Sequence, residues 1–393
     1  MISRADFDAY NNDVEKLVKQ ARQQTVWQVE AWIRINPDAS VAECREMAKE
    51  TMSGMVQAYG EASATLAAKW YDKQAQKAHV KLPEAITETT YSKETIDKVA
   101  HYQAKKLING DISGFAKSCG ELVENEMKQS LNETILANTK RDKQKGVRFA
   151  RVTTGAETCA FCYMLASRGA VYHTRKTAGE QSHYHRGCDC KIVPGFEDDR
   201  FAEIVEGYDP EGMYDRMLLM EKQTGLSFSN KEDLSALSKE MKLRDKQWLM
   251  DGTIPKPRYE SEAVRGFKTR TKQASQAHNQ ELETVKAIQQ DGFAAVFVQD
   301  EVFNEKTRKI DSYADLESGL EIKTLINAKS YNTINGYIKE TSKRKKNAIA
   351  LLFDNRANNL PDEVLIMWIN QSRSFSKGSI YILDHNQQIR KIR

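Results

Sequence analysis

The sequence contains no long hydrophobic run. No stretch approaches the roughly 18 uninterrupted apolar residues of a membrane-spanning helix. The opening segment, MISRADFDAY, lacks the apolar centre of a signal peptide. We therefore expect a protein that is made and resides in a cytoplasm and has no membrane partner.

Neither sign of charge dominates. The chain has 59 Lys and Arg against 55 Asp and Glu, which gives a formal net charge of +4. This balance argues against a globally basic protein that coats polyanions. At 393 residues, of which 40% are hydrophobic, the chain is long enough for two or three domains with separate cores.

Cysteine is also scarce, since the chain has only 6, too few for a disulfide scaffold. Cys44 and Cys119 lie in helical patterns, and Cys119 falls on an apolar stripe where a small buried side chain suffices. The other four fall within one segment, at positions 159, 162, 188 and 190. Clustering of this kind indicates a metal site.

The cysteine segment has the ligand types and spacing of a tetrahedral zinc site. Cys159 and Cys162 can point into one turn, and a second pair follows after a loop. Four residues compete for that second pair: His183, His185, Cys188 and Cys190. We predict a structural Zn²⁺ held by Cys159, Cys162 and two of His185, Cys188 and Cys190. A small core of reduced thiols and a Cys159–Cys162 disulfide are the alternatives.

Hydrophobic periodicity and turn signals predict a multidomain chain. The first third has apolar residues at helical spacing, Ser40 and Glu43 have capping-box spacing, and Asn109-Gly110 is a helix stop. We predict five segments: a mainly α region at 1–145, a small α+β zinc-knuckle unit at 146–196, a helical extension at 197–255, a linker at 256–278 and an α/β domain with a mixed sheet at 279–393.

Within the last segment the patterns predict alternating elements. The expected helices span about residues 280–290 and 331–345. The expected strands are 293–298, a pair within 310–325, 348–353, 364–369 and 379–383.

The cysteine segment carries a family resemblance. Its strings Cys-Ala-Phe-Cys, Leu-Ala-Ser-Arg-Gly-Ala-Val-Tyr and His-Arg-Gly-Cys-Asp-Cys resemble the minor capsid proteins of tailed phages related to the Mu F head morphogenesis protein. The resemblance covers about residues 1–245. It implies a virion protein near the portal, with portal and capsid proteins as partners, and a role in head assembly or DNA packaging. Members of that family sometimes carry a C-terminal enzyme or toxin.

A second set of residues, in the C-terminal segment, has the character of a phosphodiesterase site. Glu321 and Lys323 lie two apart on a predicted strand and share one face, and a predicted hairpin places Asp315 near its turn. Two carboxylates can hold a divalent metal such as Mg²⁺, while a lysine stabilises the charge that develops on the phosphate.

The order of helix, strands, Asp and Glu-x-Lys resembles the Asp...Glu-x-Lys nuclease superfamily, over about residues 276–393. It is particularly similar to the transfer-RNA-cleaving toxin domains of contact-dependent inhibition systems. The resemblance implies Glu281, Asp315 and Glu321 as metal ligands and Lys323 as the catalytic cation. Asp311 is a possible substitute for Asp315. Transfer RNA is the implied substrate, and we expect a small acidic immunity protein as a partner.

Basic residues follow on the next predicted helix. The five candidates for binding nucleic-acid phosphates are Lys339, Lys343, Arg344, Lys345 and Lys346. Tyr331 or Tyr337 is available to stack on a base.

Two other interpretations of this segment stay open. One is a purely structural or binding module, in which Glu321 and Lys323 face solvent on a half-exposed strand. The other is a metal-independent ribonuclease that cleaves through the 2′-hydroxyl. In that case His278 and His385 are the acid and base candidates, with Lys323 and Thr333 assisting.

Overall fold

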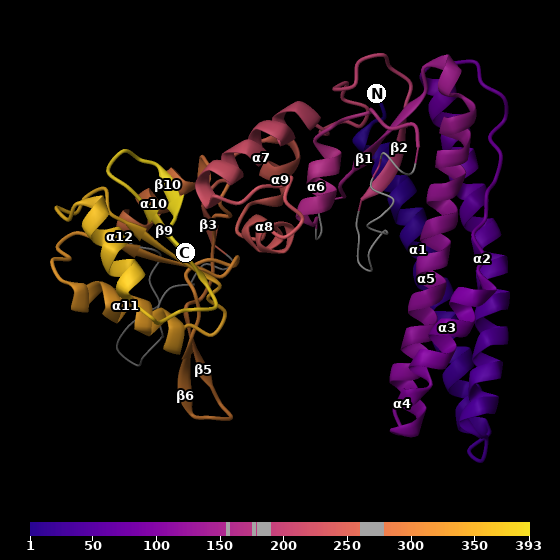
Figure 1. Ribbon diagram of the computed structural model, residues 1–393, viewed down its shortest axis with the longest axis horizontal. Helices are drawn as coiled ribbons and strands as arrows, with labels where there is room; N and C mark the ends of the chain where they lie inside the picture. The colour runs from indigo at the N-terminus through magenta and orange to yellow at the C-terminus, as the bar shows by residue number, and fades with distance from the viewer. Residues whose placement is uncertain (155–157, 175–177, 179–189, 260–278) are drawn as a thin grey trace. The chain divides into compact units, whose positions relative to one another are not determined.

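The chain folds into two compact units, described here from a computed structural model of residues 1–154, 158–174, 178, 190–259 and 279–393 (Figure 1). The N-terminal unit comprises Met1–Thr154 and Arg168–Pro210, and the C-terminal unit comprises Gly155–Ser167 and Glu211–Arg393. The predicted mainly helical N-terminal region and the mixed sheet near the C-terminus are confirmed. In the ranges described, no helix combines the length and apolar character that a bilayer crossing requires.

Three long helices form the frame of the N-terminal unit. They are α1 (Arg4–Ile35), α2 (Val41–Lys77) and α5 (Ile112–Arg141), and they run side by side (Figure 1). The shorter α3 (Lys93–Gln103) and α4 (Lys105–Ile108) pack beside them. The 3₁₀ turn Lys143–Lys145 then leads into an antiparallel pair, β1 (Arg148–Val152) and β2 (Lys191–Gly195).

The local signals in this region behave as predicted. Ser40 and Glu43 form the capping box that begins α2. Asn109 caps the end of α4, and Gly110 follows with a φ of +74°. Cys119 is fully buried in α5, in accord with its place on the apolar stripe.

An extended segment, residues 86–90, runs along α5 and bonds to its side chains. Each rung joins one side chain of the helix to the main chain of the segment. The rungs are Asn138 with Ile86 (2.9 and 2.8 Å), Thr134 with Glu88 (3.0 and 2.9 Å) and Ser130 with Thr90 (2.9 Å). Four helical residues advance about 6.0 Å and two extended residues about 6.6 Å. The two repeats match, so we call residues 86–90 the strap.

The C-terminal unit contains a four-stranded sheet in the order β10-β9-β8-β7. Its strands are β7 (Leu320–Thr324), β8 (Ala350–Asp354), β9 (Ser379–Leu383) and β10 (Ile389–Lys391); the first three are parallel and β10 is antiparallel to β9. Helices α11 (Tyr331–Arg344) and α12 (Asp362–Gln371) cover one face, and α10 (Asn279–Gln289) packs on the other.

Two predictions for this domain are wrong. Residues 364–369 form part of α12, not a strand. Leu365 and Ile369 are buried while Met367 is 48% exposed, the spacing of a helix with one apolar face. A short apolar run cannot by itself distinguish the two structures.

The predicted hairpin is also wrong. Strand β6 (Lys309–Ser312) pairs with β5 (Glu301–Asn304), whereas β7 pairs with β8, so β6 and β7 lie in different sheets. The predicted strand 293–298 shortens to β4 (Val296–Phe297), which pairs with β3 (Arg258–Tyr259).

Helices before the predicted linker belong to the same unit as the sheet. They are α6 (Ala160–Ala166), α7 (Pro210–Thr224), α8 (Leu234–Met241) and α9 (Lys246–Asp251). The buried Glu240 of α8 accepts from Lys391 Nζ on β10 and from Ser379 Oγ on β9, both at 2.8 Å. The guanidinium of buried Arg244 lies 3.7 Å from the ring centre of Phe293. The chain passes between the two units after Thr154, Ser167 and Pro210, and all three points precede the predicted linker at 256–278.

At the carboxyl ends of the parallel strands, His385 closes a polar cluster. Its Nδ1 lies 3.0 Å from Asp362 Oδ2 and its Nε2 lies 2.8 Å from Asn358 O. The bond to the Asn358 carbonyl, and then the Asp362 carboxylate, raises the pKa of His385. Only the protonated imidazole can donate to both acceptors, so His385 is a structural clamp in this fold.

The strap predicts a contrast between two threonines of α5. Thr134→Val removes both bonds to Glu88 and leaves main-chain groups unpaired, which should cost about 1–3 kcal/mol. Thr139 is fully buried, and its hydroxyl has no hydrogen-bond partner among the residues described. Thr139→Val should therefore be neutral or stabilising. Chemical denaturation of the two variants measures the difference, and equal effects would show that the strap bonds contribute nothing.

His385 predicts a pH dependence of stability in the C-terminal unit. Because its pKa is raised by folding, its contribution is fully present below the unfolded pKa of about 6.5 and is lost as pH rises through the folded value. The unfolding midpoint of wild type should fall over that range. His385→Gln should lack this component, whereas a control change at exposed His101 should retain it. Identical pH profiles for wild type and His385→Gln would contradict the clamp.

Candidate functional site

Strand β7 divides its side chains between the two faces of the sheet. Leu320 and Ile322 join the core under α10, so Glu321 and Lys323 point to the face covered by α11. Glu321 has no exposed surface, whereas the Lys323 side chain is 23% exposed. The predicted Glu-x-Lys pair therefore reaches from the interior to the surface.

The carboxyl group of Glu321 lies between two lysines. Lys323 Nζ is 2.7 Å from Oε1, and Lys345 Nζ is 3.4 Å from Oε2. Lys345 follows the last residue of α11, and its side chain is only 11% exposed. Each oxygen of the carboxyl group thus has its own ammonium group.

Asp315 completes this cluster, which we call the Glu321 centre: Asp315, Glu321, Lys323 and Lys345. Asp315 is 4% exposed, and its Oδ2 accepts the Ile322 N–H at 2.7 Å. Its alternative, Asp311, instead contacts Lys346 Nζ at 2.6 Å and Asn304 Nδ2 at 2.8 Å. Of the two aspartates, Asp315 is the one whose charge acts on Glu321.

The electrostatics of the centre follow from its burial. Burial, and then the negative charge of Asp315, raises the pKa of Glu321 to about 7, while Lys323 and Lys345 oppose the rise. Burial alone would lower the pKa of Lys323, but its contact with Glu321 leaves that pKa above its ordinary value. A carboxyl group that changes charge near neutral pH beside a partly exposed lysine is typical of functional sites.

Glu281 lies in the first turn of α10, which packs against the other face of the sheet. Thr284, one turn later, donates to Asp354 Oδ2 at 2.6 Å and lies 3.0 Å from Thr324 Oγ1. Arg356 holds the same Asp354 carboxylate through two nitrogens, at 3.0 and 2.7 Å. The structure therefore places the predicted third metal ligand on a helix that contacts a different polar cluster.

The predicted phosphate-binding residues separate into two kinds. Lys339 and Lys343 are exposed on α11. Arg344 lies 3.5 Å from Glu340, Lys346 pairs with Asp311, and Lys345 belongs to the Glu321 centre. The sequence showed one basic run and gave no signal that its members face different surroundings.

Two of the remaining acid–base and stacking candidates, Thr333 and Tyr337, have structural contacts. Thr333 donates its N–H to Ser330 Oγ in the N-cap of α11. The half-buried Tyr337 packs against Phe353, with Lys323 Nζ 5.9 Å from its ring centre. Tyr331 is half-buried at the start of α11, and His278 lies outside the described residues.

The predicted zinc ligands are described only in part. Cys159 caps α6, its Sγ accepting the Cys162 N–H at 3.4 Å, in the C-terminal unit. Cys190 is buried in the N-terminal unit. His185 and Cys188 lie outside the described residues, as does His183. In the part of the chain that is described, no three His, Cys, Asp or Glu side chains form a metal-binding group, and zinc stays a prediction.

Cys190 has a contact that the sequence did not predict. Buried Arg151 on β1 places Nη2 at 2.6 Å and Nε at 3.2 Å from its Sγ, and Nη1 donates to Ala178 O at 3.0 Å. The register of β1 against β2 brings the pair together, which spacing along the chain does not indicate.

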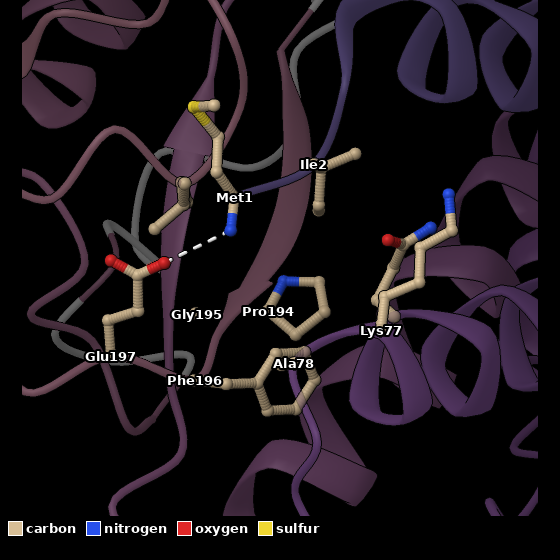
Figure 2. A pocket seen from close by; sticks show the side chains of 10 residues that line it. Met1, Ile2, Lys77, Ala78, Pro194, Gly195, Phe196 and Glu197 are labelled. Carbon is tan, nitrogen blue, oxygen red and sulfur yellow. Dashed lines mark hydrogen bonds and ion pairs between the residues drawn. The ribbon is translucent and has the colours of Figure 1, made fainter.

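A small pocket opens near the N-terminus, where the Met1 ammonium group contacts Glu197 at 3.1 Å (Figure 2). Pro194 and Phe196 form part of its wall. Its volume of about 20 Å³ is enough for one water molecule. This pocket is therefore too small for a substrate.

Comparison with known proteins places the first part of the chain in a family. The model of the VG15 protein family matches residues 1–219. The "Gene 15 protein" of Mycobacterium phage D29 is 27% identical over 195 residues, 42% of this chain and 70% of that protein. The "Gene 15 protein" of Mycobacterium phage L5 is 30% identical over 110 residues, 18% of this chain and 37% of that protein. No solved structure matches.

These findings confirm the predicted resemblance of the N-terminal region to phage proteins. The family match spans the three-helix frame, the strap and the β1–β2 pair, and ends within α7. The Glu321 centre lies beyond it. By the extent of that match, the chain belongs to the VG15 protein family.

Proposed function

We propose that this chain is a phage virion protein of head morphogenesis whose C-terminal unit is a nuclease that cuts RNA. Family membership and phage relatives support the first part. Portal and capsid proteins are its proposed partners, and the virion near the portal is its proposed location. The single observation that carries the second part is the Glu321 centre, which combines two buried carboxyl groups with two lysines.

The residues of the centre suit phosphodiester hydrolysis. Lys323 is partly exposed and fixed by Glu321, so its ammonium group can meet a phosphate from solvent and stabilise the charge formed as the bond breaks. Exposed Lys339 and Lys343 can neutralise neighbouring phosphates of the strand. Transfer RNA is the proposed substrate because the sequence resemblance points there.

The two carboxyl groups of the centre are oxygen donors of the kind that Mg²⁺ prefers, but Lys323 and Lys345 occupy both oxygens of Glu321 and would have to give way to a metal ion. Mg²⁺ needs only one or two protein carboxylates, with water and substrate phosphate as its other ligands. Asp315 and Glu321 would hold it, and it would supply an activated water. The third predicted ligand, Glu281, remains a proposal because α10 packs on the other face of the sheet. A structural zinc at the cysteine segment is likewise proposed.

A second candidate is a metal-independent ribonuclease. This candidate is favoured because Lys323 and Lys345 occupy both oxygens of Glu321, the positions that a metal ion would need. Here the 2′-oxygen attacks phosphorus and gives its proton to solvent, the partly exposed Lys323 stabilises the charge that develops on the phosphate, and the departing 5′-oxygen takes a proton from water. His385 is not part of this candidate because it clamps Asn358 and Asp362.

A nuclease of this kind would also endanger the cell that makes it. We therefore propose a small acidic inhibitor that covers Lys339 and Lys343 until the virion is assembled.

Replacement of Lys323 tests the nuclease. The full chain is produced under tight control in a bacterium, and growth and total RNA are followed. Wild type should arrest growth with discrete RNA fragments, and Lys323→Ala should lower cleavage by the purified protein on the order of 10²–10³-fold, because it removes a preorganised cation. Lys286→Ala, an exposed lysine of α10, is the matched control.

Unfolding curves of each variant, together with Lys323→Arg, show whether the C-terminal unit remains intact. If wild type is harmless and leaves RNA and DNA whole, the C-terminal unit is a structural or binding module instead.

Metal dependence separates the two catalytic candidates. Chelation with excess EDTA should abolish RNA cleavage, and added Mg²⁺, but not added Zn²⁺, should restore it. Each metal is added back separately because EDTA would also remove a structural zinc, and the loss of that zinc must be told apart from the loss of a catalytic Mg²⁺. Cleavage that continues at full rate in chelator would select the metal-independent ribonuclease.

A further inference from the structure

Lys345 differs from the other basic residues around the end of α11 in its surroundings. Its side chain is 11% exposed, whereas Arg344 beside it is 74% exposed. A lysine that binds nucleic-acid phosphates must reach solvent. Lys345 instead directs its ammonium group to the fully buried Glu321.

The main chain around Lys345 is held from both sides. Its N–H donates to Thr341 O at 3.2 Å, which closes α11, and Lys346 N donates to Ser312 O on β6 at 2.9 Å. Two residues further, Asn347 Oδ1 accepts the Ala314 N–H at 2.7 Å. Ala314 precedes Asp315, so these bonds join the end of α11 to the segment that carries the second carboxylate of the centre.

The ion pair of Lys346 with Asp311 strengthens the same connection at the surface, at 2.6 Å. These contacts fix the main chain of Lys345, and so they fix the point from which its side chain extends to Glu321. Long side chains lose conformational entropy when they are fixed, so a fixed lysine needs a strong partner. A buried carboxylate is such a partner, because an unpaired charge in the interior is costly.

We propose that Lys345 is a positioning residue of the nuclease centre, which holds Glu321 in place opposite Lys323, and is not part of the phosphate-binding surface. This inference rests on the proposed nuclease function. Each oxygen of Glu321 contacts the ammonium group of a different lysine, so loss of either lysine allows the carboxyl group to rotate. Lys323 remains the cation that can meet substrate, because it is the more exposed of the two.

The first test separates turnover from binding with purified full-length protein on the RNA that wild type cuts. Lys345→Ala should lower kcat on the order of 10- to 100-fold with KM nearly unchanged, because it misplaces a catalytic group. Lys345→Arg should recover part of kcat. Lys343→Ala should raise KM instead, and Lys286→Ala should change neither. A Lys345→Ala protein that changes only KM, as Lys343→Ala does, would overturn the proposal.

The second test does not depend on nuclease activity. Lys345→Met is introduced into wild type and into Glu321→Gln, and the unfolding midpoint of the C-terminal unit is measured. The substitution should lower the midpoint by a few degrees in wild type and by less in Glu321→Gln, because the residues are coupled. Equal shifts would refute the contact. If wild type cuts neither RNA nor DNA, the proposed function fails while this cycle still decides the role of Lys345.

Discussion

Burial of the Glu321 carboxyl group is the constraint on which the C-terminal site depends. A charge in the interior must be paired or neutralised, and here it is met by lysines from two elements, β7 and the end of α11. Such a pair adds little net stability, because removing both charges from water costs as much as their attraction returns. The proposed function gives the pair a role that its small contribution to stability does not explain.

The fold around that site was predictable where a local signal agreed with the global structure. Helix caps, the long amphipathic helices and the existence of a strand at 320–324 follow from spacing and periodicity, but the parallel pairing of that strand with β8 does not. The errors fall where two structures share one pattern. Val364–Ile369 is apolar throughout, a pattern that predicts a strand, yet it forms a helix with one exposed face. Strand β6 pairs with β5 and not with β7, its partner in the predicted hairpin.

The sequence predicts which types of residue form the site, but not every residue that belongs to it. Glu321 and Lys323 lie two apart on one strand, so their shared face follows from the sequence alone. Lys345 comes 22 residues after Lys323 by their numbers in the sequence, and its place depends on how α11 packs and ends. The same holds for Glu240 and Lys391, whose contact brings α8 into the unit of the sheet. Contacts of this range have no signature in a single sequence.

The strap along α5 restricts how the N-terminal unit can vary in length. Its rungs repeat every two residues on the extended segment and every four on the helix. Loss of a single residue within 86–90 would turn the next main-chain groups away from the helix, because successive residues of an extended chain face opposite sides. Loss of two would instead restore the pairing one rung along. Insertions and deletions that this unit accepts inside the strap should therefore involve an even number of residues. Those in the turns on either side of the strap can involve any number.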